Sequence, residues 1–210
     1  MNFRSWMTER GISPEQVRLM TIATTGKSYG EGKNALVSVS HADIDGQDVT
    51  HMYIKGVPTQ EVEKGTPFNG ITPEILEEYG DTIMEAQDAL QALLDPVQIL
   101  VGYTDRFMQG FLVNAFPGLA LPPILNVVDM IKVCDLGFNF PGQAANAPEL
   151  CDAFAKGSKG ATRAGGYSVK AIRDSMGWHP ALTPSDIICS AEESIHNLLF
   201  LWQHISTREI

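Results

Sequence analysis

The order of the short apolar segments along the chain constrains the fold more than any single motif. Two runs of apolar and β-branched residues, 35–40 and 50–54, flank the turn-forming sequence HADIDGQD, a pattern typical of a β-hairpin. A third extended segment is predicted around TQEVEKG, and helical and strand patterns alternate after it. We therefore predict a three-layer α/β fold with a mixed central sheet flanked by helices, antiparallel in its first three strands and parallel afterwards.

The alternating part of the chain is predicted from its hydrophobic periodicity. Helices are expected in NGITPEILEEYG, TIMEAQDALQALLD and TDRFMQGFLVNAF, and a buried strand in PVQILVGY. The pattern of PPILNVVDMIKVC fits a strand or a helix equally well. A short helix is predicted in GGYSVKAIRDSMGW and a long final helix in LTPSDIICSAEESIHNLLFLWQHI.

Residues 1–34 precede the first predicted strand and are interpreted as an N-terminal extension, which leaves 35–210 as the main domain. Ser13, Pro14 and Gln16 form the start pattern of a helix, so one short helix is predicted in the extension. The segment TIATTGKSYGEGKN is interpreted as a loop. Its TTGKS imitates the end of a phosphate-binding loop, but Thr21 occupies the first glycine position of that motif, so a nucleotide loop is not the preferred interpretation.

The balance of charge limits the kinds of partner. The chain has 15 Lys and Arg against 25 Asp and Glu, a net charge of −10. Because phosphate contacts supply most non-specific affinity for nucleic acids, strong DNA binding is not expected. No apolar run approaches the roughly 20 residues that span a bilayer, so no membrane contact and a cytoplasmic location are expected. The three cysteines lack the spacing of a zinc site or a disulfide framework.

The aspartates of HADIDGQD raise the question of a metal site. Asp43, Asp45 and Asp48 surround Gly46 as in the start of a calcium loop, but such a loop needs a glutamate at its twelfth position, where this chain has Ile54. An Asp-Gly pair is favoured in hairpins because the turn needs positive φ. We predict a solvated turn, and no metal or other cofactor is expected.

Four segments carry a resemblance to a known family. GTPFNGITPEIL is similar to its HGIT.E.L segment, ILVGYTDRFMQGFL to ilVgHNa.FD..fL and GGYSVKAIRDSMGW to hsL..L...lgi, while the final helix takes the place of HnAl.Da..t..l. The family is the DEDD-type 3′–5′ exonuclease superfamily, DnaQ-like and ribonuclease T-like, and the likeness covers about residues 35–206. The resemblance implies a ribonuclease H-like fold and, in an active member, two metal ions held by four carboxylates, with a histidine as general base.

The residues that the resemblance aligns with the catalytic positions are not carboxylates. The Asp-x-Glu of the first strand aligns with Ser38 and Ser40, and the aspartate after the family's phenylalanine aligns with Met108. In the final helix, the histidine and the aspartate align with Cys189 and Ser194. Hydroxyl, thiol and thioether groups cannot hold two hard cations, so the resemblance implies a degenerate site with no catalytic residue.

Other residues are predicted to line what is left of the substrate groove. Asn69 replaces the histidine of HGIT, and Tyr103 stands where the family has His-Asn. Tyr103 and Phe107 are of the kind that stacks on bases, although core packing is the preferred interpretation of Phe107. The predicted residual groove consists of His41, Asn69, Tyr103 and Phe107.

Several functions stay open at this point. The preferred hypothesis is a pseudo-exonuclease that acts as a binding or structural module, with a protein partner or by self-association, and with weak nucleic-acid binding at most. The alternative is a divergent 3′–5′ exonuclease that uses Mg²⁺ or Mn²⁺ on relocated ligands. A third hypothesis has residues 1–34 docking onto another chain. The candidates for relocated ligands are Asp43, Asp45, Glu192 and Glu193.

Overall fold

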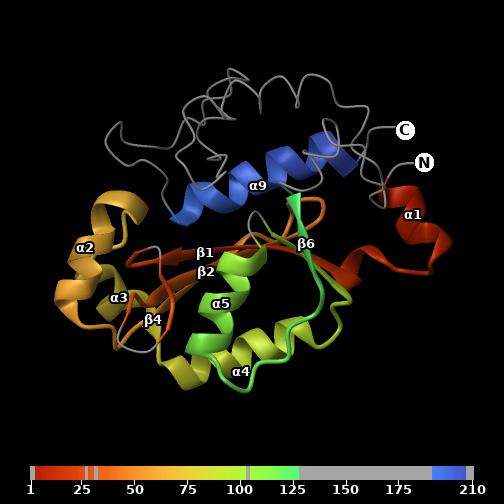
Figure 1. The fold of residues 1–210 in the computed structure, drawn as a ribbon. Coiled ribbons are helices and arrows are strands. Elements are labelled where there is room, and N and C mark those ends of the chain that lie inside the picture. The colour runs from red at the N-terminus through yellow and green to blue at the C-terminus, as the bar shows by residue number, and fades with distance from the viewer. Residues whose placement is uncertain (1–2, 27, 31–32, 103–104, 128–190, 207–210) are drawn as a thin grey trace.

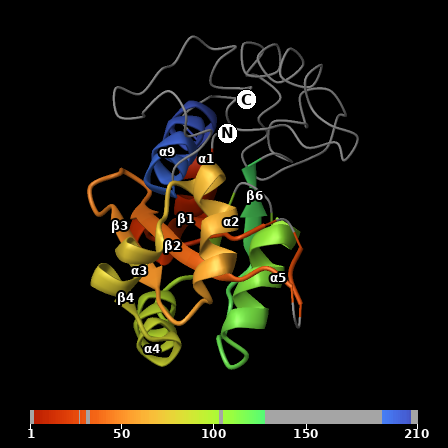
Figure 2. The same ribbon diagram turned by 90° about the vertical axis from the view of Figure 1, so that its left-hand side faces the viewer.

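A computed structural model describes residues 3–26, 28–30, 33–102, 105–127 and 191–206. These residues form three layers (Figure 1). The middle layer is a six-stranded sheet. Helix α9 (Ala191–Ser206) covers one face, and α4 (Ile83–Leu94) and α5 (Asp105–Ala115) lie on the other, as the turned view of Figure 2 shows. The prediction of an α/β layer fold is confirmed.

The sheet is mixed, with the strand order β4-β3-β2-β1-β5-β6. β1 and β3 both pair antiparallel with β2, while β5 runs parallel to β1 and β6 parallel to β5. This arrangement is the predicted one, with three antiparallel strands first and parallel strands afterwards. The strands are β1 (Val17–Thr24), β2 (Leu36–Asp43), β3 (Thr50–Ile54), β4 (Gly80–Asp81), β5 (Ile99–Gly102) and β6 (Ile124–Asn126).

Two of the helices begin at recognisable capping residues. Thr72 caps α3 by accepting the backbone N–H of Ile75. Thr82 and Glu85 form a capping box at the start of α4, as expected for helix N-termini. Besides α4, α5 and α9, the described helices are α1 (Phe3–Glu9), the 3₁₀-helix η1 (Pro14–Gln16), α2 (Thr59–Asn69) and α3 (Pro73–Tyr79).

The first strand of the sheet lies further towards the N-terminus than predicted. Residues 17–24, predicted as part of an extension, form the central strand β1, and the segment 35–40 belongs to the second strand. The predicted helix after Ser13 ends after one turn, in which Gln16 Oε1 accepts the Ser13 N–H at 2.9 Å. Hydrogen-bonded ladders to β2 and β5 on both sides of β1 override the local helix signal.

A second correction concerns TQEVEKG, which is predicted as an extended segment and is helical. It forms most of α2, which ends at Gly70 with φ 73°. The segment consists largely of good helix formers. Its one large apolar residue, Val62, is buried on the same side as Gly65 and Asn69, a spacing that suits a helix and not a strand.

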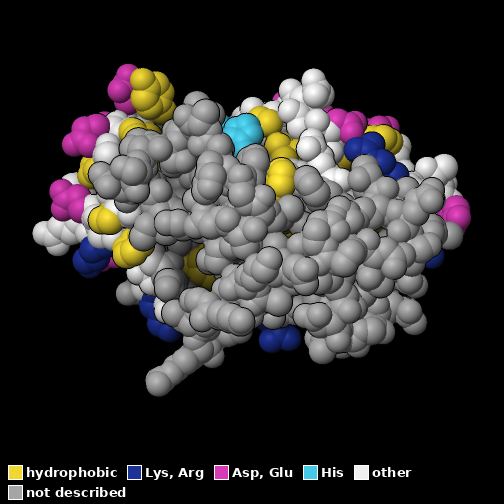
Figure 3. Space-filling model, turned by 90° about the horizontal axis from the view of Figure 1, so that it is seen from above, with side chains coloured by type: hydrophobic (Ala, Val, Ile, Leu, Met, Phe, Trp, Pro, Cys, Tyr) yellow, Lys and Arg dark blue, Asp and Glu magenta, His cyan; other side chains and the backbone are white. Residues whose placement is uncertain are grey.

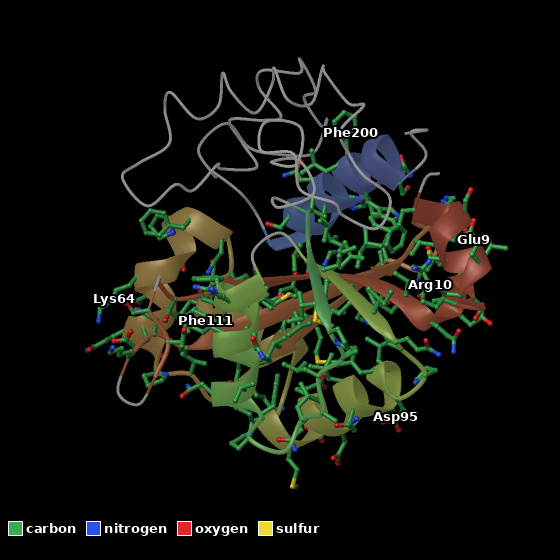
Figure 4. The ribbon with its side chains drawn as sticks, turned by 45° about the vertical axis from the view of Figure 1, so that its right-hand side comes forward. Glu9, Arg10, Lys64, Asp95, Phe111 and Phe200 are labelled. Atoms are coloured by element: carbon green, nitrogen blue, oxygen red, sulfur yellow. The ribbon has the colours of Figure 1, made fainter. Side chains whose placement is uncertain are left out.

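The two faces of the sheet hold separate apolar cores. Under α9, the core contains Leu19, Leu198 and Trp202, and the Phe3 ring of α1 lies 4.8 Å from that of Trp202. On the opposite face, α4 and α5 contribute a core that includes Phe111, which Figure 4 shows on α5. Burial on both faces explains why the central strands are almost continuously apolar.

The HADIDGQD segment is a turn between β2 and β3, as predicted. Asp43 Oδ1 accepts the backbone N–H groups of Asp45 at 3.1 Å and of Gln47 at 2.8 Å, and Gly46 has φ 74°. Asp45 pairs with Arg4 at 2.6 Å, and Asp48 pairs with Arg18 at 2.9 Å. All three aspartates therefore have roles in shaping or anchoring the turn.

Several predictions fall outside the described residues. They include the loop and short helix expected between 138 and 178, the start of the final helix, and the three cysteines. Within the described part of the chain, no helix is long and apolar enough to cross a membrane.

Candidate functional site at the end of the central strand

The most suitable place for a site is the end of β1. The ladder between β1 and β5 ends where Met20 pairs with Gly102, whereas β1 continues to Thr24. From β1 the chain runs to β2 on one side and later to β5 on the other. In open α/β sheets, ligands bind beyond the carboxyl ends of the strands at such a switch in direction. The segment Thr21–Thr25 is therefore the centre of the candidate site.

Polar side chains of three strands meet on one face at this point. Thr21 of β1 lies opposite Ser40 of β2, and Ser40 lies opposite His51 of β3. Directly opposed residues carry their side chains on the same face. Since Leu19, two residues before Thr21, belongs to the core under α9, this polar row lies on the face of the sheet that α9 covers.

The hydroxyl groups in this row differ in their hydrogen bonding. Ser40 Oγ lies 2.8 Å from His51 Nδ1, which makes a cross-strand hydrogen bond. Ser38, opposite Ala23 in the next row, and Thr21 are both buried, and their hydroxyl oxygens have no hydrogen-bond partner among the described residues. Buried polar groups without a hydrogen-bond partner are uncommon in folded proteins. We call Thr21, Ser38 and Ser40 the hydroxyl cluster.

Helix α2 closes the end of β1 from the side. Asn69 Nδ2 donates to the Thr24 carbonyl at 3.0 Å, and its Oδ1 accepts the N–H of Ile71 at 2.8 Å. Gly65 approaches so closely that a Cβ there would lie 2.9 Å from the Thr25 Cα. Asn69, predicted to line a groove, is thus a structural link between β1 and the α2–α3 connection.

The loop between β1 and β2 is held on its other side by α5. Tyr29 lies against Gly110, and its ring centroid is 5.7 Å from that of Phe111. Beside this contact is an open hollow of about 620 Å³, which Arg106 and Asn114 also line. The hollow presents one cation, Arg106, and one exposed aromatic ring, that of Tyr29.

His41 does not belong to the hydroxyl cluster. It follows Ser40 on β2 and therefore points to the opposite face, where it lies opposite Met20. Burial is the main cause that lowers the pKa of His41, and the charge of Arg18 lowers it further, while Asp48 opposes the shift. His41 and Asn69 act at β1 positions four residues apart, roughly 13 Å along a strand, so they do not line one groove.

The structure places the other predicted positions in different surroundings. Ser38 and Ser40 are on the second strand, β2, and not on the first strand as predicted. Met108 is buried in the core under α4 and α5, and Phe107 packs against Phe111 at 4.9 Å, which agrees with its core interpretation. Ser194 is half-buried on α9.

Some predicted positions cannot be placed. Tyr103 and Cys189 lie outside the described residues, and the side chains of Glu192 and Glu193 are not described either. Among the described side chains, no group of three His, Cys, Asp or Glu residues is arranged to hold a metal ion.

The residues missed from the sequence are Thr21, Thr24 and Gly65. The apolar and β-branched residues within Val17–Thr24 were the available signal, but the start pattern at Ser13 pointed to a helix. The pairing of Thr21 with Ser40 joins residues of two strands across a loop, and no local pattern reports it.

Comparison with known proteins gives structural matches alone. No protein-family model and no curated protein sequence matches the chain. Solved structures of exonuclease I do match. The fold is ribonuclease H-like. The apo form of exonuclease I aligns with a TM-score of 0.60 at 13% identity, over 92% of this chain and 42% of that chain.

Two nucleic-acid complexes of the E. coli enzyme give the same result. Exonuclease I with a dT13 oligonucleotide has a TM-score of 0.60 at 13% identity, over 91% of this chain and 41% of its own. The zinc-bound complex with single-stranded DNA has a TM-score of 0.61 at 13% identity, over 92% and 41%. This chain thus spans about two fifths of the length of the exonuclease I chains, and the likeness establishes the fold.

Proposed function

We propose that this chain is a catalytically degenerate exonuclease-like domain that acts as a binding or structural module. The observation that carries the proposal is the composition of β1. The family's first pair of metal ligands, Asp-x-Glu, belongs on the first strand, and the eight residues of β1, VRLMTIAT, contain no Asp or Glu. This holds in any register of the motif along the strand.

The side chains at the end of β1 are poor ligands for the metals of this chemistry. Thr21, Ser38 and Ser40 offer neutral hydroxyls, whereas Mg²⁺ and Mn²⁺ in two-metal sites are held by charged carboxylates. Met108 offers a thioether that is buried in the opposite core. Replacing acids at such a place also removes repulsion between like charges, so the scaffold can persist without the site.

The alternative, a divergent exonuclease with relocated ligands, makes a different demand on the same strand. An in-line attack needs two metals near the end of β1. The first described acids that follow β1 in the sequence, Asp43 and Asp45, shape the hairpin turn after β2. Glu192 and Glu193 remain as the relocated ligands that the alternative requires.

A direct test combines activity and metal binding on the full chain. A single-stranded oligonucleotide labelled at its 5′ end is incubated with the protein and Mg²⁺ or Mn²⁺, beside E. coli exonuclease I. Thermal melting is recorded with and without each metal, because a ligand that binds the native state raises the melting temperature. The proposal expects no trimming and no metal-dependent rise.

Matched variants make the opposite result interpretable. Glu193→Gln removes a relocated ligand, and Glu63→Gln removes an exposed acid of α2 as the control. Trimming from the 3′ end that Glu193→Gln abolishes and Glu63→Gln preserves would overturn the proposal and establish the divergent exonuclease.

As a module, the domain is proposed to bind a protein or a second copy of itself. The net charge of −10 supports this over general binding to nucleic acid. The hollow beside Arg106 and Tyr29 is the place where residual binding of a nucleic-acid end is proposed, since bases stack on aromatic rings and phosphates pair with arginine.

A further inference from the structure

The edge of the sheet formed by α3, β4 and α4 exposes large apolar side chains. Met84 is 72% exposed, Tyr79 62% and Ile83 51%. All three lie within six residues of sequence, around the edge strand β4. We call residues 73–95 the acidic edge, for the charges described below. Exposed apolar side chains that gather at one place mark interaction surfaces more often than scattered ones do.

A hollow of about 520 Å³ lies next to these side chains. Ile54 and Val57, at and after the end of β3, form one side of it, and Ile83 and Glu77 contribute from α4 and α3. Lys55 also lines the hollow, so its walls are largely apolar and its lining carries one acid, Glu77, and one cation. Its size suits one or two large side chains of a partner.

The charge of this edge is one-sided. Residues 73–95 contain seven acidic residues and no Lys, Arg or His. Along the left margin of Figure 3, the end where α2 and α3 lie in Figure 1, acidic and hydrophobic side chains lie beside one another, with Lys or Arg side chains near them. Asp95 projects from the end of α4 in Figure 4. The seven are Glu74, Glu77, Glu78, Asp81, Glu85, Asp88 and Asp95.

None of the ion pairs among the described residues includes one of these seven acids, although the charge of Lys55 helps to lower the pKa of Glu85. The described ion pairs join Arg4 to Asp45, Arg18 to Asp48 and Lys64 to Glu61, all outside the acidic edge. Hydrogen bonds at the helix caps, from Thr72 to Glu74 and from Thr82 to Glu85, lower the pKa of both carboxyl groups. Both carboxyl groups therefore stay negatively charged at neutral pH, and the seven acids of the edge outnumber the one cation, Lys55, that lines the hollow.

The charge selects among the occupants that an apolar hollow could take. Nucleic acid and anionic lipid surfaces would be repelled. A second copy that docks through the same face would set acids against acids, because a two-fold contact brings the same surface together twice. A protein segment with Lys or Arg beside large apolar side chains complements both the charge and the hollow.

We propose that the acidic edge binds a basic, apolar segment of a partner protein. Apolar side chains of the segment enter the hollow beside Ile83 and cover Met84 and Tyr79, and its Lys or Arg side chains pair with the surrounding carboxylates. The inference gives the proposed binding module a partner class, and it does not depend on the state of the hydroxyl cluster.

The test uses a short synthetic peptide of Leu and Lys with a fluorescent label, titrated into the full chain. A Leu and Glu peptide of the same pattern is the control for charge. Amide shifts in ¹⁵N-labelled protein locate the binding site. The edge variant combines Glu77→Lys with Met84→Ser, and the matched control combines Glu63→Lys with Phe68→Ser, an exposed acid and an apolar side chain of α2 that is 59% exposed.

The proposal expects the Lys peptide to bind, with shifts centred on residues 73–95. The edge variant should weaken binding by about tenfold or more and the α2 control by less than about twofold, and raised salt should weaken it as well. Melting temperatures of both variants near that of the wild type show that the effect is not one of folding.

Other results overturn the proposal. Equal binding by the edge variant, shifts centred elsewhere, or equal binding of the Glu peptide each contradict it. A dimer in sedimentation that the edge variant dissociates would assign the face to a second copy. The oligonucleotide assay separates this inference from the proposed function. A chain that trims DNA and also binds the peptide through its acidic edge would overturn the proposed loss of catalysis and leave the docking proposal in place.

Discussion

Along the same strands, the side chains on one face of the sheet stay apolar, whereas those on the other face change from apolar to polar. On the face towards α4 and α5, apolar residues continue along β1, with Met20 and Ile22 in the same core as Leu100. On the face towards α9, Leu19 is followed by Thr21, with Ser40 beside it.

The difference separates what holds the domain together from what a site needs. A continuous apolar face contributes stability in proportion to the surface that it buries. Buried hydroxyls without partners contribute little or cost stability. We infer that the core under α4 and α5 and the core under α9 stabilise the fold. Residues of the hydroxyl cluster can then be replaced with a small loss of stability.

The largest expected loss of stability comes from a substitution in the core under α4 and α5. Phe111→Ala removes a ring that is 1% exposed and leaves a cavity, so the free energy of unfolding should fall by about 3–5 kcal/mol. Val113→Ala on the same helix is the control, because Val113 is half-exposed and should cost less than about 0.5 kcal/mol. Urea unfolding measures both. Similar losses in the two variants would contradict the assignment of the core.

Two helical glycines give a sharper comparison between the faces. Gly65→Ala and Gly110→Ala gain the same helix propensity, about 1 kcal/mol. The new Cβ of Gly65→Ala meets the Thr25 backbone at the end of β1, whereas that of Gly110→Ala meets the ring of Tyr29, an exposed side chain that can swing away. We expect Gly65→Ala to be net destabilising by about 1–2 kcal/mol and Gly110→Ala to be neutral or stabilising.

Thermal melting ranks these two glycine variants directly. Equal melting temperatures, or a lower one for Gly110→Ala, would mean that α2 can shift away from the end of β1 at a smaller cost in stability than the close approach of Gly65 indicates.

Within the hydroxyl cluster, two serines of one strand should differ. Ser40→Ala removes the hydrogen bond to His51 and should cost about 1 kcal/mol. Ser38→Ala removes a buried hydroxyl without a partner and should be neutral or slightly stabilising. Urea unfolding of both variants provides the measurement. A Ser38→Ala variant as unstable as Ser40→Ala would reveal a bound water or ligand at Ser38.

Much of the fold could be predicted because its signals are local. Helices α3, α4 and α5 have apolar residues at helical spacing, and Thr72 and Thr82 mark where two of them begin. Helix α2 was missed because one buried residue, Val62, gives no period. β1 was missed because the start pattern at Ser13 is real but governs only one turn.

The site was harder to predict than the fold because it is assembled from separate strands. Ser38 and Ser40 were singled out on the assumption that they lie on the first strand, and they lie opposite Ala23 and Thr21 of the true first strand. Neither β1 nor β2 has an Asp or Glu at these positions. Taking β2 for the first strand therefore led to the same interpretation, a site without carboxylate ligands. His41 and Asn69 are distant in the fold because strand alternation and the α2 end place them separately.

The last prediction concerns pH and again contrasts the two faces of the sheet, since the His41 side chain points away from the hydroxyl cluster. Burial and Arg18 lower its pKa in the folded chain below the unfolded value of 6.5. Between the two values the unfolded chain binds more protons, so the free energy of unfolding rises with pH and is lost as pH falls below about 6.5, by at most about 1.4 kcal/mol per pH unit. His41→Gln should flatten this part of the stability profile, measured by urea unfolding at a series of pH values. His196→Gln, which changes an exposed histidine of α9, is the matched control variant. An unchanged slope in His41→Gln would mean that the proton uptake on unfolding belongs to other groups.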